Sequence, residues 1–471
     1  MQHSKIARRH TGRYFLGSLL GLVALVSSGF GQSITISPKV GPPTSQILVS
    51  GSGFSAHATV NIGFGGTELA SRVTNTSGSF ANVAIEIPAT AAPGHHGVTA
   101  QQQGSSLMAH APFLVRTNWR QFHFFPNHVG LNRFENVLST EKVVNLAMLW
   151  SFPTANVVES SAAVVDGIVF IGSNDDNLYA MDADTGAFLW NFTTGKVVQS
   201  APAVNSNIVY VGSFDGNLYA LKQATGALLW TFTTGGAVAS APTVINGIVY
   251  FGSDDSNVYA VDAASGKLLW KVLTGGAVTS SPAVANNTVY VGSADSHLYA
   301  LDASTGAHVW RFKVGGGIAS SPLVTSNEVI FGSNNHHVFA LKASTGTLAW
   351  SNSTKGAVRS SPATDSNGLV YVGSDDGRLY AFSASTGAVA WKRATGSAVS
   401  SSPAVADGVV YVGSFDDHVY AYRASSGTLL WSFATGAAVV SSPVVANGIL
   451  YIGSNDTNVY AFALPEAPEH P

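Results

Sequence analysis

Cysteine is absent from the 471 residues of the chain. Disulfides, thiolate zinc sites, iron–sulfur clusters and covalently attached c-type haem are therefore excluded. Charge is also scarce, since charged residues make up 10% of the sequence against about 25% in typical soluble domains. The 23 basic and 26 acidic residues form no long run of either sign and leave a formal net charge of −3. Because phosphate contacts need a basic face, this balance argues against a nucleic-acid partner.

Long apolar runs are almost missing as well, and the one that occurs extends from Tyr14 to Val26. Basic residues precede it and small residues follow it, namely Lys5, Arg8, Arg9 and Arg13, then Ser27, Ser28, Gly29 and Gly31. This order predicts a secretory signal peptide over residues 1–31, and hence a protein that is secreted, periplasmic or at the cell surface. The alternative, a retained membrane anchor, needs about 20 apolar residues, and serine and glycine interrupt this run. We expect no membrane insertion of the mature chain.

Short β-rich runs separated by turns occupy residues 33–115. Short strands with a turn signal about every 8 to 12 residues favour a small β-sandwich. The segment resembles the IPT/TIG immunoglobulin-like family on these residues: Pro38, Gly41-Pro42, Gly51-Ser52-Gly53-Phe54, Pro88, Pro93-Gly94 and Ala111-Pro112-Phe113. The resemblance implies an Ig-like spacer or adhesive module and carries over no catalytic residue.

The chain then becomes repetitive, with tryptophan as the clearest marker. The in-phase tryptophans are Trp150, Trp190, Trp230, Trp270, Trp310, Trp350, Trp391 and Trp431. Six of the seven intervals are 40 residues long and one is 41. A fixed period of about 40 residues marks a repeat architecture in which each repeat is one supersecondary unit.

One repeat shows how the unit is expected to fold. Between Ser200 and Phe232, four β-rich runs are separated by turns at 205–207, 214–217 and 222–226. No helical period interrupts them, so each repeat is predicted to be a four-stranded antiparallel propeller blade. The small residues of Ser200–Val204 predict the innermost strand, and the run Ala227–Phe232, with its tryptophan, predicts the outermost one.

The strand count predicts how the ring closes. The first tryptophan strand, Leu146–Phe152, precedes every inner run, and the last repeat ends at Tyr460–Phe462 without a tryptophan strand. Pairing of these two ends would complete a ring of eight blades and leave no open edge. We therefore predict an all-β protein, with an eight-bladed β-propeller over 146–464 after the Ig-like sandwich. A linker, 116–145, would join the two, and 465–471 would be a disordered tail.

The repeat resembles the pyrroloquinoline-quinone (PQQ)-like propeller family through the motif Ala-x-Asp-x-x-Thr-Gly-x-x-x-Trp. The motif runs from Ala180 to Trp190, and close copies end at Trp270 and Trp310. The Gly-His and Trp-Asp markers of WD40 propellers are missing from the repeats. The resemblance implies that the eight tryptophans dock between neighbouring blades. The preceding residues also look like the lead-in of many such propellers, on Trp119, Phe122, Asn127, Gly130 and Asn132.

Two branches of this family imply different functions. Quinoprotein dehydrogenases hold PQQ and Ca²⁺ at the propeller centre, with the quinone stacked between a tryptophan and a disulfide of adjacent cysteines. This chain has no cysteine, and its equal repeats lack the long insertions that build such a pocket. The other branch is not enzymatic and contains BamB-like envelope assembly factors and sensor ectodomains, although BamB-like proteins carry an anchoring cysteine that is missing here.

Aspartate recurs in the turn between the second and third strands of the repeats. The series is Asp175, Asp215, Asp255, Asp295, Asp376, Asp416 and Asp456, with Asn335 interrupting it. Clustered oxygens would suit Ca²⁺. Each aspartate lies in its own hairpin, however, where aspartate is favoured by the turn itself, so a structural role is the preferred interpretation.

Two further positions are candidate binding sites. Four consecutive repeats replace an asparagine by His297, His337, Arg378 and His418. These are either solvated turn residues or a pH-responsive rim patch for an anionic partner, because histidine gains charge near neutral pH. The second is the residue directly before the small-residue run of each repeat, where Glu159 and Arg359 are the only charged residues among the eight repeats. They are either tolerated loop residues or the mouth of a small-ligand channel.

These features favour a non-catalytic, exported binding or scaffold protein that acts as a monomer and needs no cofactor. Its partners would be envelope or extracellular proteins, or glycans, bound on the face of the rigid propeller. The alternative is a PQQ-dependent oxidoreductase that uses calcium and acts on alcohols or sugars. No nucleophile–base pair, metal triad or phosphate loop is evident, so no catalytic, cofactor-binding or metal-ligating residue is predicted.

Overall fold

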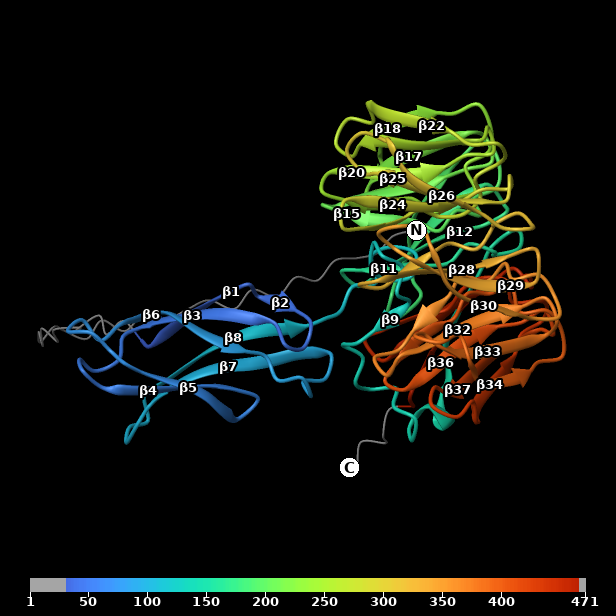
Figure 1. The fold of residues 1–471 in the computed structure, drawn as a ribbon. Coiled ribbons are helices and arrows are strands. Elements are labelled where there is room, and N and C mark those ends of the chain that lie inside the picture. The colour runs from blue at the N-terminus through green and yellow to red at the C-terminus, as the bar shows by residue number, and fades with distance from the viewer. Residues whose placement is uncertain (1–30, 466–471) are drawn as a thin grey trace, which may run out of the picture.

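The computed structural model describes residues 31–465, and the predicted signal peptide and C-terminal tail fall almost entirely outside this range. The chain forms a two-sheet sandwich followed by a ring of sheets (Figure 1). The three-stranded sheet has the order β1 (Ser33–Ser37), β3 (Gln46–Ser52) and β6 (Phe80–Glu86). The five-stranded sheet has the order β2 (Val40–Gly41), β8 (Met108–Val115), β7 (Gly94–Gln102), β4 (Thr59–Phe64) and β5 (Thr67–Val73).

Alternation of apolar and polar residues explains the sandwich. In β1 and β3, Ile34, Ile36, Ile47 and Val49 are buried and their neighbours in sequence are not. Successive strand residues point to opposite faces, so each sheet presents one apolar face to the shared core. Membership of the IPT/TIG family stays a prediction from the sequence.

Eight blades of four strands each form the ring and are named blades 1 to 8 in chain order, and a short fifth strand is added to the sheet of blade 7. Blade 1 contains β11 (Ala163–Val165), β12 (Ile168–Gly172), β13 (Asn177–Asp182) and β14 (Phe188–Thr193). Blade 2 contains β15 (Ala203–Asn205), β16 (Ile208–Gly212), β17 (Asn217–Lys222) and β18 (Leu228–Thr233). Blade 3 contains β19 (Thr243–Ile245), β20 (Ile248–Gly252), β21 (Asn257–Asp262) and β22 (Leu268–Leu273). Blade 4 contains β23 (Ala283–Ala285), β24 (Thr288–Gly292), β25 (His297–Asp302) and β26 (His308–Lys313).

The second half of the ring repeats this pattern. Blade 5 contains β27 (Leu323–Val324), β28 (Glu328–Ser333), β29 (His337–Lys342) and β30 (Leu348–Ser353). Blade 6 contains β31 (Ala363–Thr364), β32 (Leu369–Ser374), β33 (Arg378–Ser383) and β34 (Val389–Ala394). Blade 7 contains β35 (Ala404–Ala406), β36 (Val409–Gly413), β37 (His418–Arg423) and β38 (Leu429–Ala434). Blade 8 contains β39 (Val444–Ala446), β40 (Ile449–Gly453), β41 (Asn458–Ala463) and β10 (Ala147–Pro153).

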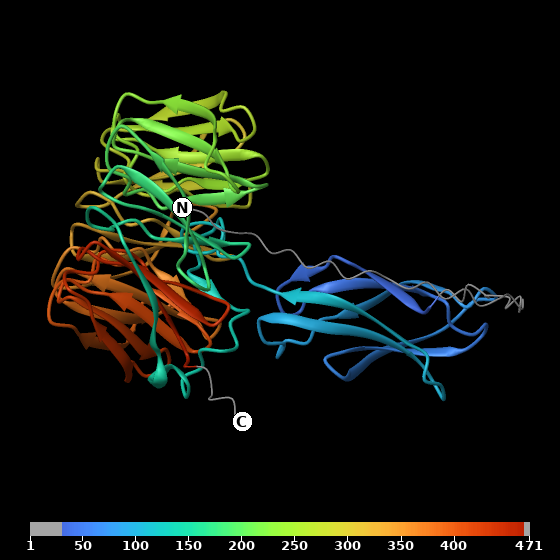
Figure 2. The same cartoon turned by 180° about the vertical axis from the view of Figure 1, so that it is seen from behind.

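Blade 8 closes the ring by strand exchange, which confirms the predicted architecture. Its outermost strand β10 comes from the start of the propeller and pairs antiparallel with β41 at the end, with Ser151 opposite Tyr460. Both views show the teal segment that precedes blade 1 beside the red C-terminal strands (Figures 1 and 2). The pairing satisfies the edge of β41, so no blade is left with three strands.

The inner end of each blade differs from the prediction. The run Ser200–Val204 is not one strand, because β15 begins only at Ala203. Ser200 instead donates its hydroxyl to the Ser240 carbonyl of the next blade at 3.0 Å and accepts the Gly212 backbone N–H at 3.2 Å. The serine therefore bonds to the neighbouring blade. Pro202 in the same run has no N–H and cannot donate to a strand within its own blade. The same kind of bond closes the circle from Ser441 to Ser160 at 2.9 Å.

At the outer end, each tryptophan joins its blade to the next one. The Trp150 indole N–H donates to the Ala183 carbonyl of blade 1 at 3.1 Å, and the Trp431 indole closes the series on the Leu146 carbonyl at 3.0 Å. The Trp150 ring also packs on Gly186, which has a φ of +71°. A Cβ at Gly186 would lie 2.7 Å from the ring, so both the turn and the docking require the glycine of the Thr-Gly motif.

Residues 119–132, here called the lead-in segment, do more than link the two parts. Their backbone or side chains bond to the inner strand of every blade, from Trp119 with Val164 of blade 1 to Asn132 with Val445 of blade 8. The segment ends in β9 (Leu131–Asn132), which pairs parallel with β35, and a 3₁₀ turn at Val143–Asn145 precedes β10. The lead-in segment therefore covers the ring axis at one face.

Candidate functional site

The two faces of the ring offer different chemistry. The hairpin face carries the turns between second and third strands, such as 173–176, and the lead-in face carries the inner turns, such as 166–167, and the lead-in segment. All predicted site residues other than the tryptophans lie on the hairpin face. A cavity lies on the lead-in face, beside residues for which the sequence had suggested a linker and a lead-in to the propeller.

The recurrent aspartates are engaged within their own turns. Asp295 accepts the Tyr299 hydroxyl at 2.6 Å, the Gly275 N–H at 2.6 Å and the His297 N–H at 2.9 Å. Burial works against ionisation of Asp295, but these hydrogen bonds together hold its pKa below the ordinary value. Burial, and then the bond to this carboxylate, raises the pKa of Tyr299 to about 12. The carboxylate oxygens are thus used to fix the hairpin.

The one exception to the aspartate series supports this interpretation. Blade 5 has Asn335 in place of aspartate, and it also has Phe339 where the other seven blades have tyrosine. In this blade there is no tyrosine hydroxyl to donate a hydrogen bond, so no carboxylate is needed to accept it. The two exceptions therefore occur together. In residues 31–465 no group of three or more histidine, aspartate or glutamate side chains is arranged to hold a metal ion.

The rim residues His297, His337, Arg378 and His418 lie in the hairpins of blades 4 to 7. Each histidine Nδ1 lies within hydrogen-bond distance of the carbonyl two residues earlier, at 3.2 Å for His297, 3.0 Å for His337 and 2.8 Å for His418. Because a carbonyl only accepts, Nδ1 carries the proton and Nε2 is left as an acceptor. Each ring also lies over an aromatic side chain two residues on, with centroids 5.6 Å apart for His418 and Tyr420.

Asparagine performs the same local task in three of the other blades. The Asn177 amide donates to the Asp175 carbonyl at 2.9 Å, as the histidine Nδ1 does in blades 4, 5 and 7, and Asn257 and Asn458 make the same bond. In blade 2 the Asn217 amide donates to the Tyr219 hydroxyl at 3.2 Å instead. The fold therefore tolerates either residue, and histidine adds only an exposed imidazole edge. The structure brings these histidines onto neighbouring blades of one face but not into a shared cluster.

Glu159 and Arg359, the two charges predicted at the channel mouth, are engaged in separate networks. The Glu159 carboxylate accepts the Gln199 amide at 2.5 Å and the Asn174 amide at 3.1 Å. Arg359 donates to the Asp375 carboxylate at 2.5 Å, and its side chain is 55% exposed. The first network joins blades 1 and 2 and the second belongs to blade 6, so the two charges do not form one site.

The ring axis on the lead-in face is filled by two histidines that sequence reasoning missed. His123 and His128 are fully buried, and the His128 Nε2 lies 3.1 Å from the Thr243 hydroxyl of blade 3. The Thr243 proton is already given to the Pro282 carbonyl, so His128 must donate through Nε2. Burial lowers the pKa of His123 to about 4, and burial together with repulsion from His123 lowers that of His128 to about 3.

These residues do not fit PQQ with calcium. Calcium in proteins is bound by about 6 to 8 oxygen ligands. On the hairpin face the two carboxylates at the mouth are already engaged, Glu159 by two amides and Asp375 by Arg359, and on the lead-in face the axis is occupied by neutral imidazoles. PQQ is itself a tricarboxylate, and the one cation at the mouth, Arg359, is already paired with Asp375. No step is therefore derived through this cofactor.

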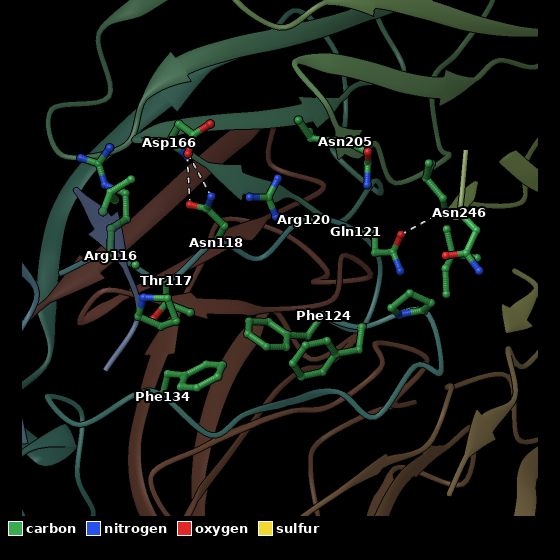
Figure 3. A pocket seen from close by; sticks show the side chains of 18 residues that line it. Arg116, Thr117, Asn118, Arg120, Gln121, Phe124, Phe134, Asp166, Asn205 and Asn246 are labelled. Atoms are coloured by element: carbon green, nitrogen blue, oxygen red, sulfur yellow. Dashed lines mark hydrogen bonds between the residues drawn. The ribbon is translucent and has the colours of Figure 1, made fainter. Parts of the chain in front are cut away.

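The cavity on the lead-in face has a volume of about 500 Å³ and lies where the sandwich, the lead-in segment and blades 1 to 3 meet (Figure 3). Arg116, Arg120 and Gln121 come from the chain between the sandwich and β9, and Asp166 and Asn205 come from inner turns. The density of aromatic residues from Trp119 to Phe125 is the one sequence signal that this stretch is packed.

Eight blades of four strands, terminal strand exchange and docked tryptophans define the class: an eight-bladed β-propeller of the PQQ-type fold. The model of the family described as "Beta-alanine-activating enzyme, beta-propeller" matches residues 131–342 and 284–468. Together these ranges cover more than half of the chain, which therefore belongs to this propeller family. No curated protein matches the sequence.

Solved structures with this fold include both alcohol dehydrogenases and BamB. Quinohemoprotein alcohol dehydrogenase from Comamonas testosteroni aligns with a TM-score of 0.66 and 18% identity, over 75% of this chain and 81% of its own. BamB from Moraxella catarrhalis aligns with a TM-score of 0.60 and 21% identity, over 68% of this chain and 99% of its own. A europium-containing methanol dehydrogenase gives a TM-score of 0.66 at 14% identity, over 74% and 98%. These identities show a shared fold.

Proposed function

We propose that the protein is an exported, non-catalytic binding protein that uses the hairpin face of its propeller as an interaction platform. The observation that carries the proposal is the contrast within each hairpin. The aspartate–tyrosine bonds hold the turns in one geometry, while the half-buried position beside them changes from blade to blade. A rigid framework with variable surface positions is the usual design of a recognition surface.

The proposed partner surface is the rim patch of His297, His337, Arg378 and His418. Three of these residues lie beside a hairpin carboxylate, with His297 3.3 Å from Asp295 and Arg378 3.9 Å from Asp376. The patch therefore becomes net positive only as the histidines are protonated, and its partner would then be an anionic protein surface. The likeness to BamB supports a role in the cell envelope, and export rests on the predicted signal peptide. An acidic glycan is the other ligand class that this patch would suit.

Conversion of the three rim histidines to asparagine tests the proposal. Asparagine is the native residue in blades 1, 2, 3 and 8, and in blades 1, 3 and 8 its amide makes the same bond to the turn carbonyl, so the variant should fold normally. Pull-downs from the envelope fraction at about pH 5.5 should recover a partner with the wild-type protein and lose it with the variant. Equal recovery by both proteins would contradict the rim patch as the binding surface.

A matched gain-of-function control is available in the same ring. Asn177→His, Asn217→His and Asn257→His would place a second rim patch on blades 1 to 3, at positions where blades 4, 5 and 7 already carry histidine. This variant should bind at least as well as the wild type at acid pH.

The alternative, a PQQ-dependent oxidoreductase, is supported only by the fold shared with the alcohol dehydrogenases. It requires that purified protein incubated with PQQ and Ca²⁺ acquire a quinone absorbance and reduce a dye in the presence of alcohols. A positive result in both assays would replace the binding proposal.

A further inference from the structure

The cavity at the junction of sandwich and propeller offers hydrogen-bond donors, while the side-chain acceptors of Gln121, Asn205 and Asp166 are already used. The Gln121 carbonyl accepts the Val244 N–H at 3.1 Å, but the amide Nε2 of the same side chain is buried without a partner. The Asn205 carbonyl accepts the Ser206 hydroxyl at 2.7 Å, which leaves its amide available. A buried donor without a partner costs free energy, so this lining is suited to a ligand that accepts hydrogen bonds.

Two guanidinium groups add charge to the same lining. Arg116 and Arg120 both line the cavity, and among residues 31–465 neither forms an ion pair. The single carboxylate of the lining, Asp166, accepts the Asn118 amide at 2.9 Å and the Gln223 amide at 3.2 Å. Figure 3 shows Arg120 beside Asn118 and facing the open space toward Asn205. The lining therefore has an excess of positive charge.

The remaining wall is aromatic and held in place from behind. Phe124 is 5% exposed and packs edge-on against Trp119, with ring centroids 5.0 Å apart. Phe125 stands perpendicular to Phe124 at 4.5 Å, and Phe134 completes the wall. Arg133 lies over the rings of Phe125 and Phe134 at 5.5 and 5.3 Å. A flat apolar body of ring size would fit against such a wall.

We propose that this cavity is a binding site for a small organic carboxylate that carries a ring-sized apolar body. The carboxylate would be held by Arg120 and by the unpartnered Gln121 amide, the more distant Arg116 would add positive charge to the lining, and the body would lie against Phe124. A planar carboxylate matches the fork of a guanidinium in a bidentate pair. The volume of about 500 Å³ lies within the range of small-molecule sites. The site is independent of the rim patch, because it lies on the opposite face.

Benzoate is the simplest probe, and benzyl alcohol and inorganic phosphate are its matched controls. Titrations of the mature chain followed by ligand-observed NMR should show saturable benzoate binding, with a Kd on the order of 1 mM for so small a ligand. Benzyl alcohol lacks the charge and phosphate lacks the apolar body, so both should bind at least about tenfold more weakly. Equal binding of either control, or no saturation by benzoate, would overturn the proposal.

Substitutions locate the binding. Arg120→Gln should weaken benzoate binding about tenfold, because hydrogen bonds to a charged ligand are lost. Arg116→Gln should weaken it less, because that guanidinium acts on the ligand only through its charge. Arg72→Gln, on the exposed strand β5 of the sandwich, is the matched control and should leave binding unchanged. An unaltered thermal transition in all three variants would show that they are folded. Benzoate affinity that survives both cavity substitutions would place the ligand elsewhere and refute the site.

Discussion

The buried histidines of the lead-in segment predict that the propeller loses stability at mildly acid pH. Both side chains are neutral in the folded state, because their pKa values are lowered from 6.5 to about 4 for His123 and to about 3 for His128. In the unfolded chain they titrate near 6.5, so the unfolded state binds more protons in the interval below that value. A group with a lowered pKa of this kind contributes stability above 6.5 and loses it as the pH falls toward the folded value.

The magnitude follows from the same values. At about pH 5 both histidines are still neutral when folded and almost fully protonated when unfolded. Each therefore costs about 2 kcal/mol relative to about pH 7.5, at roughly 1.4 kcal/mol per pH unit. The two together remove about 4 kcal/mol, a large part of the 5–15 kcal/mol or so that stabilises most domains.

Urea unfolding followed by tryptophan fluorescence is the appropriate assay. All nine tryptophans lie between Trp119 and Trp431, so the signal reports the lead-in segment and the propeller and not the sandwich. His128→Gln should lose about 2 kcal/mol less than the wild type between about pH 7.5 and 5, since glutamine can still donate to Thr243 and does not titrate. Thr243→Val is the control, because it should lower stability by the same amount at both pH values. The same pH dependence in the wild type and in His128→Gln would refute the reasoning.

Three other predictions concern the ring. Deletion of 146–152 removes β10 and should lower the melting temperature, because blade 8 loses its outer strand and Trp431 loses its acceptor; an unchanged melting temperature would contradict closure by strand exchange. Trp270→Ala should cost about 3–5 kcal/mol in urea unfolding, whereas Leu269→Ala, at a site that is 49% exposed, should cost less than about 1 kcal/mol. Tyr299→Phe should cost about 1–2 kcal/mol by removing a donor from the Asp295 carboxylate.

The tyrosine prediction has a control provided by blade 5. Because Asn335 and Phe339 coexist there, Asp295→Asn combined with Tyr299→Phe should cost less than the sum of the two single changes. The lowered pKa of Asp295 also means that its contribution is present above its unfolded pKa of about 3.9 and is lost as the pH falls further. Strictly additive costs in a double-mutant cycle would contradict a coupled pair.

Much of the propeller can be predicted because each repeat contains the residues that determine its own turns and strands. The Thr-Gly turn at Gly186 needs a positive φ, the tryptophan beside it needs a neighbouring blade, and the period of 40 residues sets these signals in phase. The unpaired strands at the two ends then leave one way to satisfy their edges. The inner strand was predicted too long, because Ser200 satisfies its hydrogen bonds with the next blade, which the linear sequence does not reveal.

The candidate sites also differ in whether the sequence alone could predict them. The sequence by itself determined the repeated positions, including the histidines that replace asparagine on the rim, since eight copies make any departure visible. Only the tertiary structure decided that residues 119–132 cross the axis, that His123 and His128 are buried there, and that Arg120 faces Asn205 across a cavity. That segment occurs once and has no period, and its environment comes from inner strands that lie up to 313 residues away in the sequence. Burial and charge at such a place exist only after the ring has closed around it.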